Sequence, residues 1–339
     1  MKVVHKKYFF IVLFLIPVIN GQQWSWLYTK KFSKSETRTN QKKNHLLLAK
    51  EDTPLFSQMI FSWNSNKPVQ GYFTFYAQVR DAKTREWHIW HKMIDWGNNM
   101  QKSYLHKGPV TQYCHVRLEV PKNLPADGIR IKIIPNDHAD LSAIQSLSVT
   151  IANFNNFNQY HQQYYNHPSV CITNIPQRSQ MVLEHPRAEH MCSPTSLSML
   201  ISYLKKYHVN PLEFALGVYD EGLDSFGSWP FNIAHAYESC HGKLAFYLTR
   251  LNAFDELYTK LKQSIPVVVS VRGSLDGAPR EFKNGHLLLV IGWDKNKQHI
   301  VCHDPAFEQD HLVHTSYDIN SFCKAWARSY NLAYIAERL

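Results

Sequence analysis

Six short runs of aromatic and β-branched residues follow one another between residues 52 and 152. Several of them alternate apolar and polar side chains, as in GYFTFYAQVR and IRIKII, and turn-forming segments such as NSNKP and PADG separate them. Repeated short strands at this spacing are typical of an antiparallel sandwich, in which one face of each strand is buried. We therefore predict a β-sandwich domain over residues 51–153.

The second half of the chain has a different pattern. Apolar residues recur at helical spacing in residues 194–207 and 252–263, and short apolar runs at 266–271, 286–293 and 299–303 predict buried strands. Helices and strands that are grouped in this way favour an α+β arrangement over a repeated βαβ wind. We predict a second domain over residues 170–339.

The first residues are organised like a secretory signal. Lysines precede an apolar run over residues 8–18, and the small-residue exit Asn20-Gly21 follows it. This apolar run is shorter than the roughly 20 residues that span a membrane, although an uncleaved anchor is an alternative. We predict a signal peptide over residues 1–21, export to the periplasm or the extracellular space, and no stable span after signal removal.

Two polar segments flank the predicted sandwich. Residues 22–50 are rich in lysine, and we expect a tether or an extended first strand there. Residues 154–169 are rich in Asn, Gln and Tyr without periodicity, which is typical of a linker.

Composition limits the function classes. The net charge of +10 is dispersed apart from the 30–50 stretch, and no helix-turn-helix or zinc-finger spacing accompanies it, so we do not expect a nucleic-acid partner. His88 and His91 lack a third ligand nearby and no HExxH occurs, so we expect neither a metal nor another cofactor. The six cysteines include no CxxC pair. Export would allow disulfides, and one reactive thiol would leave at least one more cysteine unpaired.

A cysteine stands where a strong helix begins. Cys192 and Ser193 precede Pro194, which fits an early helical position because its missing N–H has no partner there. Free N–H groups and the positive end of the helix dipole stabilise a thiolate and lower the thiol pKa. We therefore predict Cys192 as a nucleophile. Taken alone, this residue could equally be a buried structural cysteine or half of a disulfide.

A histidine and an aspartate lie at the ends of two successive predicted strands. His286 opens the run HLLLVIGW, and Asp304 follows HIVCH 18 residues later. A hairpin through the turn 294–298 would bring the two residues together, so that the carboxylate orients the imidazole beside the thiol. The alternatives are a strand-end histidine and a turn-forming Asp-Pro.

A glutamine upstream of the cysteine is a candidate oxyanion donor. The amide of Gln180, together with the main-chain N–H of Cys192, would stabilise the negative oxygen of a tetrahedral intermediate. Gln177 is the rival position, and a surface glutamine is the structural alternative.

With these residues in place, the second half resembles the bacteriocin-processing (double-glycine leader) cysteine peptidases and their secreted relatives in the papain-like superfamily. The similarity covers about residues 170–339 through IPQRSQ, CSPTSLSML, WPFNIAHA, GHLLLVIGW, HDPAF, Phe322 and Trp326. It implies a cysteine nucleophile, a histidine base, an aspartate orienter and an oxyanion glutamine at Cys192, His286, Asp304 and Gln180.

The resemblance is to the secreted subgroup rather than to the leader-cleaving members. Ser193 replaces a glycine that the leader-cleaving members usually have, and the WPFN motif together with a preceding β-sandwich is similar to the secreted relatives. Trp90, Trp96 and HVRLEV extend this similarity more loosely into the first half.

The resulting expectation is an α+β protein with a papain-like cysteine peptidase domain behind an antiparallel β-sandwich. It would cleave peptide or amide bonds of a peptide or protein through Cys192, His286 and Asp304. One alternative is a catalytically weak scaffold whose sandwich binds a cell-surface or cell-envelope polymer, because exposed tryptophans can stack on sugars. Another is transamidation or hydrolysis of a non-peptide amide by the same residues.

Overall fold

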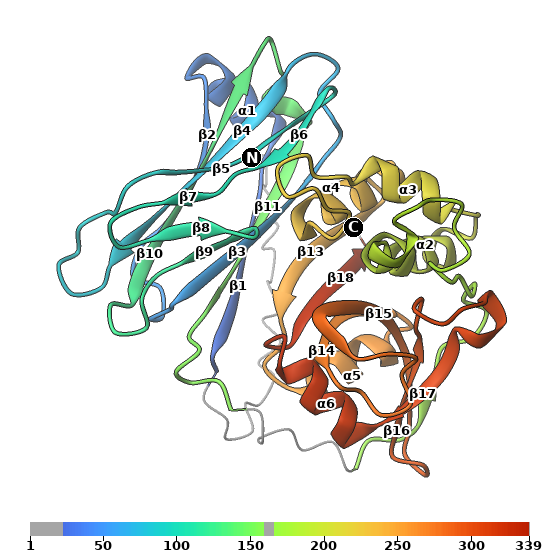
Figure 1. Ribbon diagram of the computed structural model, residues 1–339. Coiled ribbons are helices and arrows are strands. Elements are labelled where there is room, and N and C mark those ends of the chain that lie inside the picture. Colours follow the sequence, from blue (N-terminus) through green and yellow to red (C-terminus); the bar gives the residue numbers. More distant parts are fainter. Residues whose placement is uncertain (1–22, 159–165, 339) are drawn as a thin grey trace, which may run out of the picture.

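The computed structural model describes residues 23–158 and 166–338. The predicted signal peptide of residues 1–21 and part of the predicted linker lie outside them. Two parts lie side by side, an N-terminal two-sheet unit and a C-terminal half (Figure 1). No helix among the described residues has the length and apolar character needed to cross a membrane.

The two-sheet unit contains two antiparallel sheets. The first has the order β1-β11-β3-β9-β8-β7 and comprises β1 (Ser25–Lys31), β3 (Gln58–Ser65), β7 (His106–Lys107), β8 (Gln112–Cys114), β9 (Arg117–Glu119) and β11 (Ile144–Ala152). The second has the order β2-β10-β4-β5-β6 and comprises β2 (Leu46–Lys50), β4 (Tyr72–Asp81), β5 (His91–Gly97), β6 (Met100–Ser103) and β10 (Ala126–Asn136).

Both sheets contribute to one apolar core. Trp63 of β3 lies 4.4 Å from Phe75 of β4 and 5.3 Å from Trp96 of β5, measured between ring centroids. All three rings are buried, and the alternation along each strand places them on the inner faces. Trp96 is therefore a core residue rather than an exposed ligand-stacking tryptophan.

Of the two expectations for residues 22–50, the structure shows an extended first strand rather than a tether. Strand β1 pairs with β11 and strand β2 pairs with β10, so the two-sheet unit begins near residue 25 rather than at 51. Leu46 and Leu48 are buried, and this alternation stabilises β2 in its sheet. Between the two strands runs helix α1 (Lys34–Lys42), which the sequence analysis missed. Its signal was the Ser33/Glu36 spacing, since the Ser33 side chain accepts a hydrogen bond from the Glu36 N–H.

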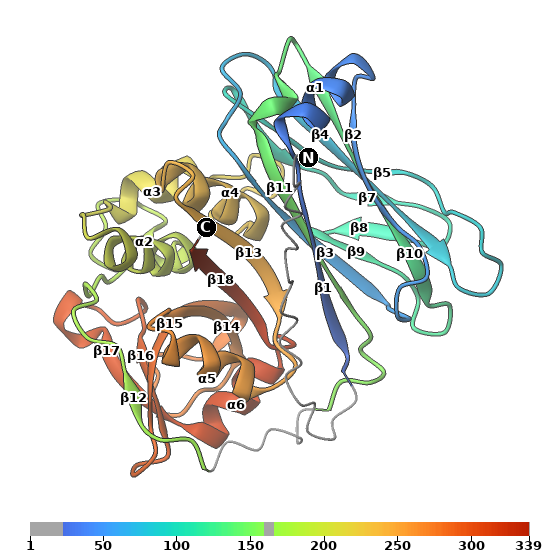
Figure 2. The ribbon, with the colours of Figure 1, turned by 180° about the vertical axis from the view of Figure 1, so that it is seen from behind.

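The C-terminal half is built on one antiparallel sheet with the order β13-β18-β14-β15-β16-β17, to which the short β12 adds beside β15. Its strands are β12 (Val170–Cys171), β13 (Leu244–Arg250), β14 (Val267–Gly273), β15 (Phe282–Asp294), β16 (His299–His303), β17 (His314–Asp318) and β18 (Leu332–Arg338). Its helices are α2 (Cys192–Lys205), α3 (Pro211–Gly217), α4 (Trp229–Ser239), α5 (Phe254–Lys262) and α6 (Ile319–Ala327). Helices α2, α3 and α4 group together at one end of this half, and β14 to β17 lie at the other (Figures 1 and 2).

Polar side chains of the two-sheet unit cover the open edge of β13. The Asn64 amide donates to the Phe246 carbonyl and accepts from the Phe246 N–H, each at 2.9 Å. The Leu248 N–H donates to Ser62 Oγ, and Thr150 Oγ1 donates to the Leu248 carbonyl. These bonds satisfy main-chain groups that an edge strand would otherwise leave unpaired. The junction between the two halves is therefore a specific interface.

The described part of the predicted linker packs into this junction. Phe154 stacks on Tyr330 of the C-terminal half with the ring centroids 4.0 Å apart, and Phe157 makes edge contacts with Trp24 and Tyr330. Residues 154–158 are therefore part of the interface between the halves rather than a free tether.

Candidate active site

The Cys192 thiol lies at the first residue of α2. The preceding Met191 caps this helix without a side-chain hydrogen bond. Helix starts leave N–H groups without intrahelical partners, and an Asp or Ser cap would have used one of them. Burial opposes ionisation of the Cys192 thiol, and the main-chain N–H groups of Ser193 and Leu287 are among the groups that lower its pKa. Because no side chain caps α2, the positive end of its dipole remains available to stabilise the Cys192 thiolate.

His286 and Asp304 come together as the hairpin predicts. Strands β15 and β16 pair antiparallel, and His286 Nε2 lies 2.7 Å from Asp304 Oδ1. Against the effect of burial, the His286 ring also lowers the pKa of the Cys192 thiol. Phe282 of the same strand stacks on this ring, with centroids 4.1 Å apart, and limits its rotation. His286 and Asp304 are buried and Cys192 is half-buried, and the structure brings these three predicted side chains together in one row, the reactive row.

The Asp304 carboxylate has further partners that the sequence analysis missed. Its Oδ1 also accepts from the Ala306 N–H at 2.9 Å, and its Oδ2 accepts from the Tyr317 hydroxyl at 2.6 Å. Tyr317 reaches it from β17, the neighbour of β16 in the sheet. No motif marks Tyr317, and only the prediction of one more strand after residue 313 could have suggested it.

The electrostatic surroundings favour the charged forms of Cys192, His286 and Asp304. Burial alone would lower the pKa of His286, but the nearby Asp304 charge outweighs it and raises this pKa to about 9. Burial opposes ionisation of Cys192, yet the hydrogen bond and charge of His286 outweigh it and lower the pKa of the thiol. Burial likewise opposes ionisation of Asp304, and the charge of His286 outweighs it and lowers the pKa of that carboxyl. A thiolate–imidazolium pair backed by a carboxylate is the state these shifts favour.

Gln180 is buried between the loops that carry the reactive groups. Its N–H donates to the Pro305 carbonyl next to Asp304. Its side-chain Nε2 donates to the carbonyls of Ala188 and Glu189, in the turn that leads to Cys192. Both amide hydrogens therefore have main-chain acceptors in this arrangement, and the oxyanion role of Gln180 stays a prediction. The rival Gln177 contributes a main-chain carbonyl to the Arg178 guanidinium.

Ser193 has a structural explanation. Its Oγ donates to Asn232 Oδ1 of the WPFN motif at 2.9 Å and lies 3.0 Å from the Tyr334 hydroxyl of β18. The residue is fully buried, so its hydroxyl ties α2 to α4 and to the sheet. A glycine at this position would leave the Asn232 oxygen without that donor.

All six cysteines are free thiols in the structure, so no disulfide competes for Cys192. Burial raises the pKa of the Cys240 thiol to about 12 and places the pKa of Cys302 and Cys323 well above the ordinary value. Partial burial also raises the pKa of Cys171. Cys192 is thus set apart from these four thiols by a lowered pKa.

His91, half of the weak metal motif, is a structural residue. It is buried, its Nδ1 pairs with the His106 carbonyl at 3.1 Å, and its Nε2 lies 2.7 Å from Thr111 Oγ1. No group of three or more metal-ligating side chains occurs in residues 23–158 or 166–338.

Comparison with known proteins addresses the C-terminal half. Residues 172–334 match the sequence model of the Peptidase_C39 like family. This match, over just under half of the chain, indicates a cysteine peptidase. No curated protein matches the chain. A solved structure similar to part of it is xylellain, a cysteine protease from Xylella fastidiosa, with 13% identity over 51% of this chain and 87% of that chain and a TM-score of 0.33.

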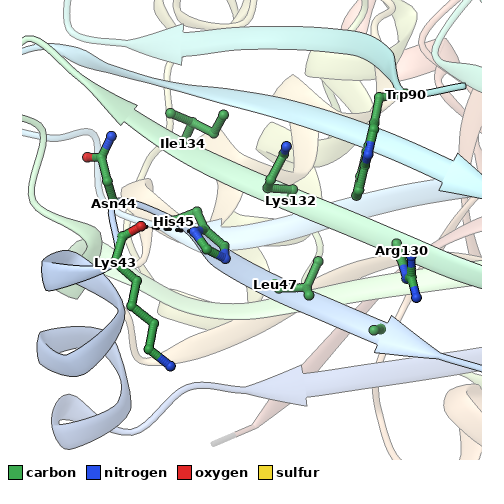
Figure 3. A pocket seen from close by; sticks show the side chains of 9 residues that line it. Lys43, Asn44, His45, Leu47, Trp90, Arg130, Lys132 and Ile134 are labelled. Atoms are coloured by element: carbon green, nitrogen blue, oxygen red, sulfur yellow. Dashed lines mark hydrogen bonds between the residues drawn. The ribbon is translucent and has the colours of Figure 1, made fainter.

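A basic groove of about 490 Å³ lies on the outer face of β2 and β10, away from the C-terminal half (Figure 3). Its lining residues are Lys43, Asn44, His45, Leu47, Ala49, Trp90, Arg130, Lys132 and Ile134. Lys132 Nζ lies 4.5 Å from the centroid of the Trp90 ring, which presents its face beside the cations. The groove combines a ring face with cations and contains no carboxylate among these lining residues.

Proposed function

We propose that this protein is an exported cysteine peptidase that works by acyl transfer through Cys192, His286 and Asp304. The observation that supports this most directly is the reactive row itself, in which His286 lies 2.7 Å from Asp304 and lowers the pKa of the Cys192 thiol against the effect of burial. Its β-sandwich and its relation to the secreted peptidase subgroup are part of the same proposal.

The proposed reaction has two halves. The Cys192 thiolate attacks the scissile carbonyl carbon, and helix-start N–H groups stabilise the oxyanion. The imidazolium of His286 then donates its proton to the leaving amine as the C–N bond breaks, which leaves a thioester. His286 next takes a proton from water, the resulting hydroxide attacks the thioester, and Cys192 leaves as thiolate. Asp304 keeps the ring oriented and balances its charge throughout.

Variants test the assignment. We expect Cys192→Ala and His286→Ala to reduce peptide cleavage by about 10⁴-fold or more, since they remove the nucleophile or its proton carrier. Cys171→Ala is the matched control, because that exposed thiol lies outside the row. A Cys192→Ala protein that cleaves peptides at the wild-type rate would refute the proposal.

Thiol chemistry gives a second test that needs no substrate. Iodoacetamide below pH 8, followed by peptide mapping, should modify Cys192 before the four cysteines whose pKa is raised, because thiolate is the reacting form. Equal modification of Cys192 in wild type and in His286→Ala would contradict the proposed ion pair.

Product analysis with and without an added amine separates hydrolysis from transamidation.

Polymer binding is a second candidate function, favoured by the groove of Figure 3. Cations beside a ring face suit a polysaccharide that carries carboxylates. Polygalacturonate should bind the Cys192→Ala protein, and Trp90→Ala or Lys132→Gln should weaken this binding about 10-fold. Lys31→Gln, an exposed change on the other sheet, is the control. Equal binding by all variants would reject the groove.

Export has its own test. If residues 1–21 are a cleaved signal, the mature protein begins at Gln22 and is recovered outside the cytoplasm. N-terminal sequencing of the fractionated protein distinguishes this from an uncleaved anchor.

A further inference from the structure

A second cavity, of about 480 Å³, lies at the junction of the two halves. Strands β3 and β9 of the two-sheet unit line one side of it, and strands β13, β14 and β15 with the start of α4 line the other. Figures 1 and 2 show the two halves meeting along β3, β11 and β13. The cavity therefore exists only because the two parts of the chain are held together.

Positive charge dominates this junction cavity. Its described lining residues include Arg117, Lys122, Arg250, Arg272 and Arg328, with Glu119 as the single carboxylate among them. Glu119 already accepts hydrogen bonds from Gln58 and Gln112 and lies 3.5 Å from Arg117. The other four cations have no carboxylate partner among the residues that the structure describes. The residues that line the cavity therefore carry more positive than negative charge.

The burial of Arg250 makes this excess of positive charge energetically unfavourable. Its side chain is only 3% exposed, and its guanidinium donates to neutral oxygens alone, at Ser329, Tyr330 and Gln58. Its buried Nε has no partner among the described residues. Burial, followed by the charge of Arg117, lowers the pKa of Arg250 to about 9. A buried charge without an opposite charge is strongly unfavourable, and one anion in the cavity would relieve it.

The junction cavity adjoins the reactive row through the backbone. Asn284 and Gly285, which line it, directly precede His286 on β15. Trp229 at the start of α4 adds an apolar wall, with the Arg117 guanidinium 5.8 Å from its ring. The cavity therefore lies next along β15 to the residue that bonds to Asp304.

We propose that the junction cavity binds a carboxylate of the peptide substrate, so that the enzyme prefers peptides with an acidic side chain or a free C-terminus near the scissile bond. This rests on the proposed peptidase function. The planar arginine donors match a carboxylate in two-point geometry, and a peptide supplies that group without any modification. The two-sheet unit thereby contributes directly to substrate choice through Gln58, Arg117 and Lys122.

Matched fluorogenic peptides test the inference. One pair differs by Glu against Gln at positions flanking the cleavage site, a second pair differs by a C-terminal acid against its amide, and a phosphoserine peptide forms a third arm. We expect kcat/KM for one acidic member to exceed that of its neutral partner by about 10- to 100-fold. The arm that shows this ratio identifies which carboxylate binds.

Variants then locate the preference. Replacing the exposed pair Arg272→Gln and Arg328→Gln should lower the acidic-to-neutral ratio of kcat/KM by about 10-fold. Lys324→Gln, exposed one turn earlier on α6, is the control and should keep the ratio. Arg250→Gln should also lower it, and a urea titration of that variant shows whether it is folded. Anisotropy of a labelled acidic peptide on Cys192→Ala protein measures the same preference without turnover.

The outcomes separate the two claims. Cleavage of neutral and acidic peptides at equal rates, or a preference for the phosphoserine peptide over both, overturns the carboxylate inference while the peptidase proposal stands. Failure to cleave any peptide, together with an unreactive Cys192, overturns the proposed function instead. A ratio that survives the Arg272→Gln/Arg328→Gln change also overturns the inference, because the preference then arises elsewhere.

Discussion

The reactive row and the junction cavity each bury a cationic side chain, but they neutralise it differently. His286 has Asp304 at 2.7 Å, and the carboxylate raises the pKa of the ring to about 9. Arg250 has only neutral oxygens as partners, and burial lowers its pKa to about 9. The chain thus gives His286 a carboxylate as a direct partner and gives Arg250 neutral oxygens alone. A site that lacks an opposite charge of its own is suited to a ligand that carries one.

The largest expected effect comes from removing the Asp304 carboxylate, which balances the charge of His286. Asp304→Ala leaves His286 buried without its carboxylate and frees the Tyr317 hydroxyl. We expect a loss of about 3–5 kcal/mol in the free energy of unfolding and at least about 100-fold in kcat/KM. Urea unfolding and peptide cleavage measure the two losses. Asp304→Asn keeps the shape and should retain more stability than activity; equal retention of both would show that the carboxylate charge is not needed.

The pH dependence of stability should show the same pairing. A raised pKa in the folded state means that His286 stabilises the fold fully below its unfolded pKa of 6.5, and that this contribution is lost as pH rises through about 9. Cys192 has a lowered pKa and acts in the opposite sense, so we would measure in the Cys192→Ala background. The free energy of unfolding should fall as the pH rises between these values, by less than the about 3 kcal/mol of the full shift, because Cys192 itself helps to raise the pKa of His286.

The matched control for this pH effect is Cys192→Ala combined with His286→Asn. That protein lacks the titrating ring, so its stability should change less over the same pH range. An identical slope in the two proteins would contradict the raised pKa of His286.

A smaller effect should follow from loosening the row without breaking it. Tyr317→Phe removes one hydrogen bond to Asp304 while keeping the ring in its buried place. Hydrogen bonds to charged groups contribute about 1.5–3 kcal/mol, so we expect about 10-fold lower kcat/KM and a comparable loss of stability. Thermal unfolding and a pH–rate profile check this. A profile identical to wild type would show that Tyr317 does not act on the carboxylate.

The sequence predicted the row better than its surroundings. Cys192 could be found because a helix start has local signals, and His286 with Asp304 because a hairpin of known length joins them. Tyr317 and Phe282 could not be found, since their contacts depend on the positions of strands that are neighbours only in the folded sheet. The position of Gln180 was found, but its amide bonds to the turn of residues 188–189 depend on loop packing.

The junction was the least predictable part. Residues 22–50 read as polar because β1 and β2 each bury one face only, and a lysine-rich strand looks like a tether without its partners. Arg250 is the last residue of β13. Its guanidinium donates to Gln58, which lies 192 residues away in the sequence. Local patterns carry no information on which distant residues approach a buried charge.

The smallest expected effect tests whether the junction is as specific as the row. Asn64→Ala removes the amide that pairs with both main-chain groups of Phe246 on the edge strand β13. Leaving these buried groups unpaired should cost about 1–3 kcal/mol, and urea unfolding measures it. Asn66→Ala, an exposed change just beyond β3, is the control. Because β13 carries Arg250 into the junction cavity, Asn64→Ala should also lower the acidic-to-neutral ratio of cleavage more than it lowers cleavage of the neutral peptide. An unchanged ratio in a destabilised protein would mean that Arg250 is positioned by its own contacts and that the two halves can loosen without affecting substrate choice.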